Sequence, residues 1–517
     1  MQQNIINDKR MLIVPALISF ILALLLLYKY NYPISWDVYY HIHMMELYST
    51  NGLVFWDYKT VAPTGRLIMY PPLFHLIFAF LSKTFNISPI TLTWITQPLF
   101  SFYLIGVITY TTYKLTDTKT AILTGFLAML TFVTFNRSVI CTPATIAIGL
   151  SMLTCLYYYE AFQKNRIKYI IYSSIALALI SNLHMATAIL TIGVLGVYTL
   201  VLIIYKKINI KFLLVYAIIF IALGLPWWIY IATKYTLIFN SIPGNNIPIT
   251  LFFYKYYGII PTILLITGYY KLAKEFDQKS IFLIIWTLSL IVVSQVNLIG
   301  VQTVSIRMLE VAAYPLIIVS GIGLTYLLEK IKKNTIKKII IILIICLSIL
   351  SAIVYVDSYT PDLLDENDYN TTMLPEQAHL IINPVTTIYK PSIISSRYQD
   401  AKLAHDRYEI AQWFKNNTNY KIAVSEDAVM DTIIVSTSQT PVIYGGFTES
   451  IPESVVDPVH IIKNWSTYNE LEDLGIGYIL LKENTTTPDY AREVYNNTNY
   501  KICEIRNNTG SSTNETI

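Results

Sequence analysis

Residues 11–30, with the sequence MLIVPALISFILALLLLYKY, decide the class of this protein. They follow the basic pair Lys9-Arg10 and match the length of about 20 apolar residues that a helix needs to cross a bilayer. No small-residue cleavage site follows them, because the chain continues with aromatic and polar residues. We therefore expect a retained first membrane helix rather than a cleaved signal peptide.

Similar apolar stretches recur through the first two thirds of the chain and predict further membrane helices. The expected spans, about eleven in all, are residues 11–30, 90–113, 120–135, 142–160, 168–183, 185–205, 212–232, 251–270, 280–298, 308–328 and 338–356. The pattern predicts an all-α, multi-span membrane bundle, because a helix satisfies its own backbone hydrogen bonds in lipid.

The composition argues against an ordinary soluble protein. The 517 residues are 54% hydrophobic and only 14% charged, whereas soluble domains carry about 25% charged residues. The net charge of +4 is too small to indicate a nucleic-acid partner. The four cysteines have neither metal-type nor disulfide-type spacing. The lipid bilayer is therefore the one partner that composition predicts.

Residues 67–82 decide the orientation, because they are apolar but contain Pro71, Pro72 and His75. If they form an interfacial or re-entrant helix, the basic clusters of the later loops share one side with the N-terminus. These clusters are Lys114/Lys119, Lys164/Arg166/Lys168, Lys206/Lys207/Lys211, Lys271/Lys274/Lys279 and Lys330/Lys332/Lys333/Lys337/Lys338. Because positive loops stay in the cytoplasm, we expect a cytoplasmic N-terminus in the cell membrane and a first outer loop at 31–89.

Residues 357–517 predict an extracytoplasmic soluble α/β domain, which follows a transmembrane domain at 1–356. Helices are expected at 404–414 and 465–474, and strands at 421–424, 441–444, 477–481 and 500–505. Their alternation predicts a small, mostly parallel sheet, followed by a frayed tail from about Asn507. N-x-Ser/Thr triplets agree with an outside location, and those in this region begin at Asn370, Asn416, Asn464, Asn484, Asn496, Asn507 and Asn514.

The first outer loop places Asp37, His41, His43 and Glu46 directly after the first span. If this loop is helical, Asp37 and His41 share one face, since they are four residues apart. Such a pair can bind a divalent metal such as Mg²⁺ or Mn²⁺ at Asp37, or act as a base and its orienting group. The alternative is an Asp that caps a helix, with the histidines as interfacial polar groups. The residues alone leave both interpretations open.

Charged and polar residues also gather where later spans reach the outer side. They are Arg137, His184, Arg307 and Glu310. Charges at such depth cost a few kcal/mol each and usually face a cavity or a partner. Guanidinium groups there suit the phosphate of a lipid-linked ligand. The alternatives are snorkelling to lipid phosphates and a purely structural pair of Arg307 with Glu310.

Short motifs across nearly the whole chain resemble the GT-C superfamily of multi-span glycosyltransferases. They are Trp36-Asp37-x-Tyr39-Tyr40-His41, Asn51-Gly52, Tyr70-Pro71-Pro72-Leu73, Asn136-Arg137-Ser138, Leu183-His184-x-x-Thr187, Arg307-Met308-x-x-x-x-x-Tyr314-Pro315-Leu316 and the segment from Tyr408 to Thr418. The resemblance is strongest to archaeal relatives of the oligosaccharyltransferase catalytic subunit. These enzymes use sugars linked to polyprenyl or dolichyl phosphate.

The resemblance implies that Asp37 acts as base or metal ligand and that Arg307 meets the lipid phosphate. Two departures limit what it implies. The acidic pair that follows the outer Arg in oligosaccharyltransferases is replaced by CTPATI at residues 141–146, and the Trp-Trp-Asp-Tyr-Gly acceptor motif is missing. We therefore expect a sugar transfer with a single carboxylate, for which a metal-independent reaction fits better, rather than protein N-glycosylation.

The resulting hypothesis is an enzyme that moves a sugar from a polyprenyl- or dolichyl-phosphate-linked donor to a glycan or protein acceptor on the outer face. Arg307 would clamp the phosphate with Arg137 or His184, and Asp37 would take the acceptor proton. The other expected catalytic residues, which orient the acceptor or hold the metal, are His41, His43 and Glu46. The other expected substrate-binding residues are Arg66, Tyr70, His75 and Glu310, with Tyr70 and His75 at the rim of the cavity. A lipid-linked-glycan transporter and a non-catalytic envelope scaffold stay open as alternatives.

Overall fold

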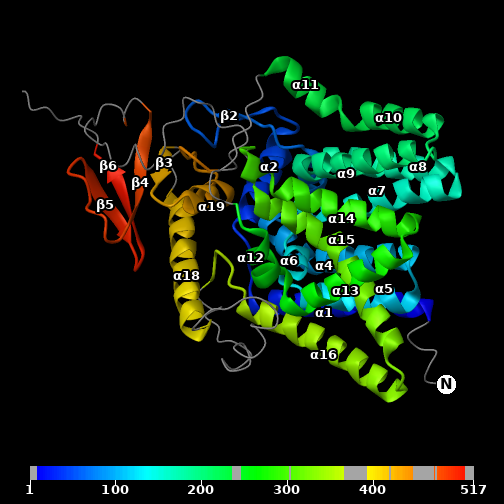
Figure 1. Ribbon diagram of the computed structural model, residues 1–517. Helices are drawn as coiled ribbons and strands as arrows, with labels where there is room; N and C mark the ends of the chain where they lie inside the picture. Colours follow the sequence, from blue (N-terminus) through cyan, green and yellow to red (C-terminus); the bar gives the residue numbers. More distant parts are fainter. Residues whose placement is uncertain are drawn as a thin grey trace, which may run out of the picture.

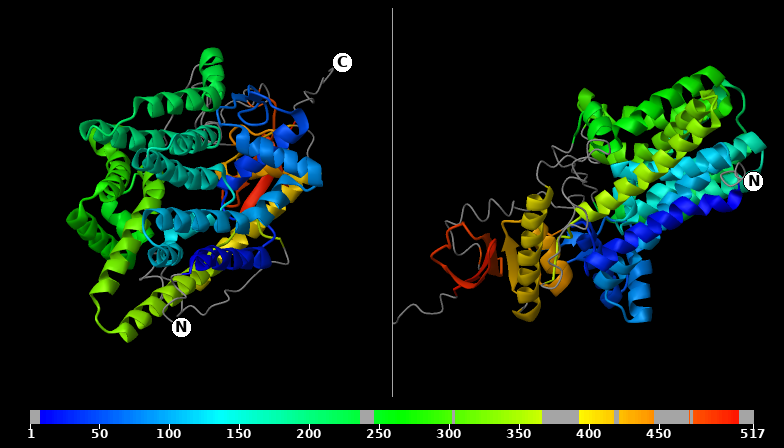
Figure 2. Two further views of the ribbon diagram at one scale, coloured as in Figure 1. Left: turned by 90° about the vertical axis from the view of Figure 1, so that its right-hand side faces the viewer. Right: turned by 90° about the horizontal axis from the view of Figure 1, so that it is seen from below.

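The computed structural model shows a bundle of helices with a small sheet beyond one of its ends (Figure 1). The right-hand view of Figure 2 shows the sheet at the end of the molecule away from the N-terminus. The residues that the structure describes are 8–235, 246–301, 304–365, 393–417, 421–445, 471 and 474–506.

The bundle helices follow the apolar stretches of the sequence. They are α1 (Val14–Lys29), α4 (Pro89–Leu115), α5 (Thr118–Leu130), α6 (Phe132–Ser138), α7 (Pro143–Lys164), α8 (Ile167–Ser181), α9 (Met185–Ile204), α10 (Ile210–Gly224), α11 (Pro226–Lys234), α12 (Ile249–Phe252), α13 (Ile259–Glu275), α14 (Gln278–Ser294), α15 (Ser305–Lys330) and α16 (Asn334–Ser358). Some of these helices begin at a capping side chain in the preceding short loop. Asp117, for example, caps α5, because its carboxylate accepts a hydrogen bond from the Thr120 amide.

Within the described residues, five helices are long and apolar enough to cross a membrane, or up to eight if each bent pair counts as one span. The bent pairs are α5 with α6, α10 with α11, and the helix at Ile249–Tyr257 with α13, with bends of 86°, 58° and 118°. The chain is thus a multi-pass membrane protein, whereas the predicted number of about eleven spans is not confirmed. Helices α8 and α14, with 15 and 17 residues, fall short of the usual spanning length of about 20.

Two short helices lie between α1 and α4, in residues 31–89, the segment that the sequence predicts to be the first outer loop. Helix α2 (Asp37–Asn51) is buried along most of its length, and α3 (Leu73–Phe85) packs against it. With 13 residues, α3 is an apolar helix too short to span, which agrees with the surface or re-entrant role expected for residues 67–82. A two-stranded ribbon, β1 (Trp56–Asp57) with β2 (Arg66–Leu67), connects the two helices.

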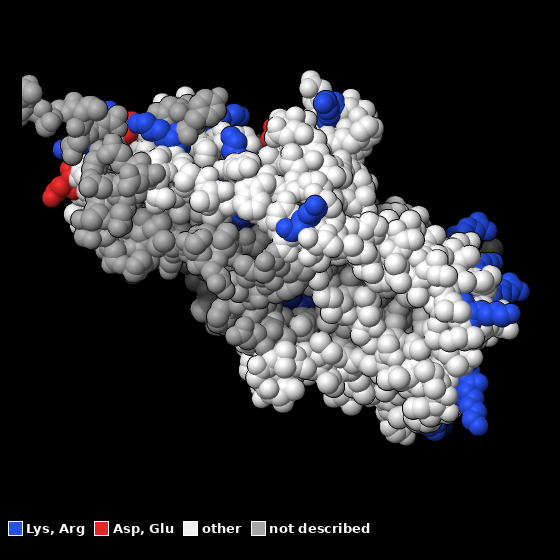
Figure 3. Space-filling model, turned by 90° about the horizontal axis from the view of Figure 1, so that it is seen from above, with Lys and Arg blue, Asp and Glu red and all other residues white. Residues whose placement is uncertain are grey.

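Lysine and arginine side chains gather on the bundle end opposite to the sheet (Figure 3). The loop between α7 and α8 contributes Lys164, Arg166 and Lys168 at this end, and all three are exposed. By the positive-inside rule this end is the one expected to face the cytoplasm, and this orientation stays a prediction.

The sheet at the other end has the strand order β3-β4-β6-β5. Its strands are β3 (Ile422–Ser425), β4 (Ile476–Lys482), β5 (Ala491–Asn496) and β6 (Tyr500–Ile505). Among the strands of the described residues, β3 pairs with β4 in parallel, whereas β6 pairs with β4 and with β5 antiparallel, so the sheet is mixed and the predicted mostly parallel sheet is wrong. The reason is a hairpin, because a short turn after β5 returns the chain as β6, between β5 and β4.

Two helices cover this sheet, α18 (Ile393–Asn417) and α19 (Ala428–Ser438). The first contains the helix expected at 404–414, whereas α19 and β5 were not expected. The strand expected at 441–444 is reduced to isolated bridges at Val442. The helix expected at 465–474 lies mostly outside the described residues.

The first outer loop joins the edge of this sheet. The Val442 amide donates to the Lys59 carbonyl at 2.8 Å, and the Ala62 amide donates to the Val442 carbonyl at 3.0 Å. Helix α19 also packs directly on α2 (Figure 1). The loop that carries Asp37 is therefore fixed between the bundle and the sheet.

Gly323 allows α15 and α13 to approach closely, because an added Cβ would overlap the backbone carbonyl oxygen of Leu264. Replacing Gly323 by Ala is expected to lower the free energy of unfolding by about 1–3 kcal/mol, since backbone must move. Gly196→Ala on α9 is the matched control, because nothing lies within 4 Å of its added Cβ. Thermal unfolding in detergent measures both, and equal midpoints for the two variants would contradict the close contact.

Candidate functional site

Asp37 lies in the first turn of α2 and reaches the start of α15. Its Oδ2 accepts a hydrogen bond from Arg307 Nη2 at 3.0 Å, across 270 residues of sequence. Trp36 takes the N-cap position, and no side-chain hydrogen bond caps the helix, so Asp37 does not cap α2. Arg307 occupies the first turn of α15, where the helix dipole disfavours a cation. The carboxylate partner offsets this unfavourable position.

Arg137 and Glu310 form a second, buried ion pair beside the first. Arg137 Nε and Nη2 donate to the two carboxylate oxygens of Glu310 at 2.6 and 2.9 Å. The side chains are only 6% and 12% exposed. A bidentate pair of this kind is strong and directional. It holds α6 against α15.

The two pairs are neighbours, since Arg307 Nη1 lies 3.9 Å from Glu310 Oε2. Asp37, Arg307, Glu310 and Arg137 therefore form one alternating row of charges, which we call the charge relay. Its members differ in access, because the side chain of Arg307 is 48% exposed and that of Asp37 is 12% exposed. Arg307 is thus the member of the relay that a ligand reaches most easily.

A cluster of rings lies within electrostatic reach of the relay. His41 Nδ1 lies 2.9 Å from His75 Nε2, and the ring of Tyr70 lies 5.1 Å from His41 and 6.3 Å from His184. Arg307, Arg137 and Asp37 act electrostatically on His184. Burial, reinforced by the neighbouring His75 and His184 rings and by Arg137 and Arg307, holds the pKa of His41 well below its ordinary value. His41 is therefore neutral and can orient a neighbour without carrying charge.

His43 points elsewhere, since its Nε2 lies 2.9 Å from Asp57 Oδ2 and both side chains are fully buried. Burial alone would raise the pKa of Asp57, but His43 and Arg66 hold it below its ordinary range. Arg66 also lies over the ring of Tyr40, at 5.3 Å. This group fixes the loop to α2, and the structure does not bring His43 to Asp37.

Glu46 lies further along α2 and is half-buried. Burial raises its pKa, while His43 opposes the shift. No hydrogen bond between Glu46 and Asp37 or Arg307 is seen in the described part of the chain. Asp37, one of the residues predicted to be catalytic, thus accepts a hydrogen bond from Arg307, which is predicted to bind the phosphate.

Several residues near the site were not expected. Asp362, which follows α16, pairs with Arg407 at 2.9 Å. Burial raises the pKa of Asp362 to about 6, although Arg407 opposes the shift, and the negative charge of Asp37 adds to it. Lys29 and Asp357 form a buried pair at 3.1 Å, which joins the ends of α1 and α16. In the sequence, Lys29 and Asp357 could have been noticed because each is a charged residue directly at the end of an apolar run.

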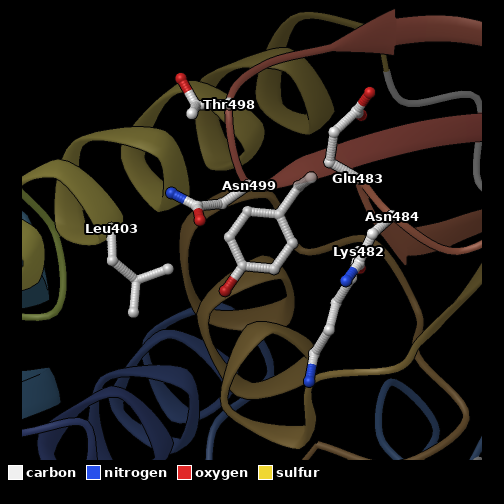
Figure 4. A pocket seen from close by; sticks show the side chains of 7 residues that line it. Leu403, Lys482, Glu483, Asn484, Thr498 and Asn499 are labelled. Atoms are coloured by element: carbon white, nitrogen blue, oxygen red, sulfur yellow. The ribbon is translucent and has the colours of Figure 1, made fainter.

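A groove of about 450 Å³ opens on the sheet, between α18 and the ends of β4 and β6 (Figure 4). Its lining offers amide, hydroxyl, ammonium and carboxylate groups, from Leu403, Lys482, Glu483, Asn484, Thr498, Asn499 and Tyr500. The Tyr500 hydroxyl donates to Asp427, which also pairs with Arg407. Because Arg407 also pairs with Asp362, polar contacts run from the groove to Asp362.

The residues around Asp37 do not fit a metal site. Among the described residues, no three His, Cys, Asp or Glu side chains come together in a way that holds a metal ion. Asp37 Oδ2 faces a guanidinium, and Oδ1 is buried without a hydrogen-bond partner. A Mg²⁺ or Mn²⁺ ion at Asp37 stays a prediction of the sequence, and no step below depends on it.

Neither a family model nor a curated protein matches the sequence. Solved structures do match. The oligosaccharyltransferase of Archaeoglobus fulgidus in its apo form gives a TM-score of 0.60 at 12% identity, over 92% of this chain and 69% of that chain. ArnT from Cupriavidus metallidurans in its apo state gives 0.58 at 11% identity, over 95% of this chain and 96% of that chain.

A third match is the arabinofuranosyltransferase AftD from mycobacteria, with a TM-score of 0.59 at 13% identity. The match covers 96% of this chain but 40% of AftD. Identities this low show a shared fold rather than a shared activity. The resemblance stated from the short motifs is confirmed at this level. The chain therefore has the fold of the GT-C membrane glycosyltransferases.

Proposed function

We propose that this protein transfers a sugar from a polyprenyl-phosphate-linked donor to an acceptor on the outer face of the membrane. The observation that carries the proposal is the 3.0 Å contact between Asp37 and Arg307. It joins a carboxylate and a half-exposed guanidinium, the two groups that such a transfer needs. The two residues are 270 positions apart in the sequence.

The solved structures with this fold support the donor class. One archaeal oligosaccharyltransferase structure contains dolichol-phosphate, and one ArnT structure contains undecaprenyl phosphate. A lipid phosphate in this protein would meet Arg307, because that side chain is the exposed cation of the charge relay. Guanidinium binds phosphate oxygens in a bidentate geometry.

In the proposed reaction, the acceptor oxygen attacks the anomeric carbon of the sugar. The bond between this carbon and the phosphate oxygen breaks, and the polyprenyl phosphate leaves with the electron pair. Arg307 stabilises the negative charge that develops on the leaving phosphate. Asp37 takes the proton of the acceptor as general base. His41 and His184 lie within electrostatic reach of Arg307, and Tyr70 packs against the ring of His41, so these rings shape the surroundings of the sugar.

The alternatives explain less of this geometry. A non-catalytic scaffold requires neither the Asp37–Arg307 contact nor a buried Arg137–Glu310 pair beside it. A transporter is expected to place its binding groups near the bilayer midplane on broken helices. Here the charge relay lies at the end of the bundle where α19 packs on α2.

Replacing Arg307 by Gln is expected to lower transfer by about 10²–10³-fold, because one strong donor to the leaving phosphate is lost. The assay uses purified protein in bilayers with polyprenyl phosphates that carry a hexose, a pentose or an amino sugar, and it measures released polyprenyl phosphate. The control is Lys330→Gln, which also removes one cation but lies at the exposed, opposite end of α15. If Arg307→Gln transfers as fast as Lys330→Gln, Arg307 does not bind the donor phosphate.

A further inference from the structure

The charge relay is electrically balanced in the structure, with two carboxylates for two guanidinium groups. A phosphate that binds in this row competes with the two carboxylates for their guanidinium partners. The strength and the solvent exposure of the two ion pairs decide which carboxylate is displaced.

The Arg137–Glu310 pair is the stronger one. It has two short hydrogen bonds, and both side chains are at least 88% buried, since their exposed fractions are 6% and 12%. Arg137 is also held by Thr142, whose hydroxyl lies 3.4 Å from Nη1. Breaking this pair would leave a buried charge without a partner, which is costly.

The Asp37–Arg307 pair is the weaker one. It has a single hydrogen bond, and its guanidinium is about half exposed. Ion pairs with an exposed partner contribute little to stability. A phosphate therefore meets Arg307 from the open side and competes with a single hydrogen bond, the one to Oδ2 of Asp37.

We infer that the donor phosphate takes Arg307 away from Asp37, so that donor binding itself releases the base. This inference rests on the proposed function. Before the donor binds, Arg307 occupies Oδ2 of Asp37, and Oδ1 is buried without a hydrogen-bond partner. After the exchange, Oδ2 has lost its cation and can accept the proton of the acceptor. The base is thus available only when a donor is in place.

If this exchange occurs, replacing Asp37 should have opposite effects on the binding of the lipid phosphate and on sugar transfer. Asp37→Asn removes the competing carboxylate, so the variant is expected to bind undecaprenyl phosphate about fivefold more tightly than the wild type. The same variant loses transfer, because it has no base. Binding is measured by native mass spectrometry in nanodiscs of a zwitterionic lipid, with a parallel titration of inorganic phosphate to separate the lipid from the free anion.

Asp362→Asn is the matched control, because Asp362 also acts on Asp37 electrostatically but pairs with Arg407 rather than Arg307. We expect no tighter binding in this variant. A second control is the double variant Asp37→Asn, Arg307→Gln, in which the gain must disappear. Asp37→Ala replaces Asp37→Asn if the latter does not fold.

The outcomes separate the inference from the proposed function. Tighter binding in Asp37→Asn alone supports the exchange. Unchanged binding in this variant, an equal gain in Asp362→Asn, or a gain that survives the loss of Arg307 overturns the exchange and leaves the proposed function standing. Folded wild-type protein that binds no undecaprenyl phosphate and transfers no sugar overturns both.

Discussion

Asp37→Asn is expected to lower the rate of sugar transfer by about 10²–10⁴-fold, the contribution of a well-placed general base. Asn keeps the shape of Asp but cannot take a proton from the acceptor. The fold should persist, because the lost ion pair involves a half-exposed guanidinium, and such pairs contribute roughly 0–1 kcal/mol. Release of polyprenyl phosphate measures the rate, and thermal unfolding verifies the fold.

The matched control is Asp489→Asn, which removes an exposed carboxylate from the sheet region without touching the charge relay. Its transfer rate should equal that of the wild type. In cells, Asp37→Asn should cause lipid-linked sugar to accumulate and envelope glycans to change. A folded Asp37→Asn protein with undiminished transfer would remove Asp37 from the mechanism.

The helical part of the fold was largely predictable, because long apolar runs are encoded locally and a helix is the way to bury them in lipid. The number of spans was not, since the bend between α5 and α6 follows no proline, and tertiary packing decides it. The parallel arrangement of the strands was predicted wrongly for a different reason, because β5 was not recognised as a strand. Strand β5 is an edge strand whose residues are mostly exposed, so Ala491–Asn496 shows no alternation of apolar and polar residues.

The site illustrates what sequence spacing can and cannot indicate. Asp37 and Arg307 were expected on the same side of the membrane because each lies at an outer end of an apolar run. The partner of Glu310 was not foreseeable. The spacing of three residues suggested Arg307 as the partner. However, Arg307 Nη1 lies 3.9 Å from a carboxylate oxygen of Glu310, whereas Arg137 Nε lies only 2.6 Å from one. The pairing of His43 with Asp57 was missed as well, because it depends on how β1 returns to α2.

Glu310→Ala is expected to lower the free energy of unfolding by about 3–5 kcal/mol, because it leaves the Arg137 guanidinium buried without an anion. Glu310→Gln should cost less, since its amide oxygen still accepts one hydrogen bond. The control is Glu329→Ala at the exposed far end of α15, with an expected change of less than about 0.5 kcal/mol. Denaturant unfolding in detergent measures all three, and equal stability of the two Ala variants would contradict the buried pair.

A double variant separates the structural role of this pair from any role in transfer. Replacing both partners, as Arg137→Met with Glu310→Leu, removes the two buried charges together and should recover most of the stability lost in Glu310→Ala. Glu310→Ala should also impair transfer, and the double variant should stay impaired, because in both variants Arg307 has lost the carboxylate that lies 3.9 Å from its Nη1. If transfer returns together with stability, the Arg137–Glu310 pair only holds α6 against α15, and the donor phosphate is bound without it.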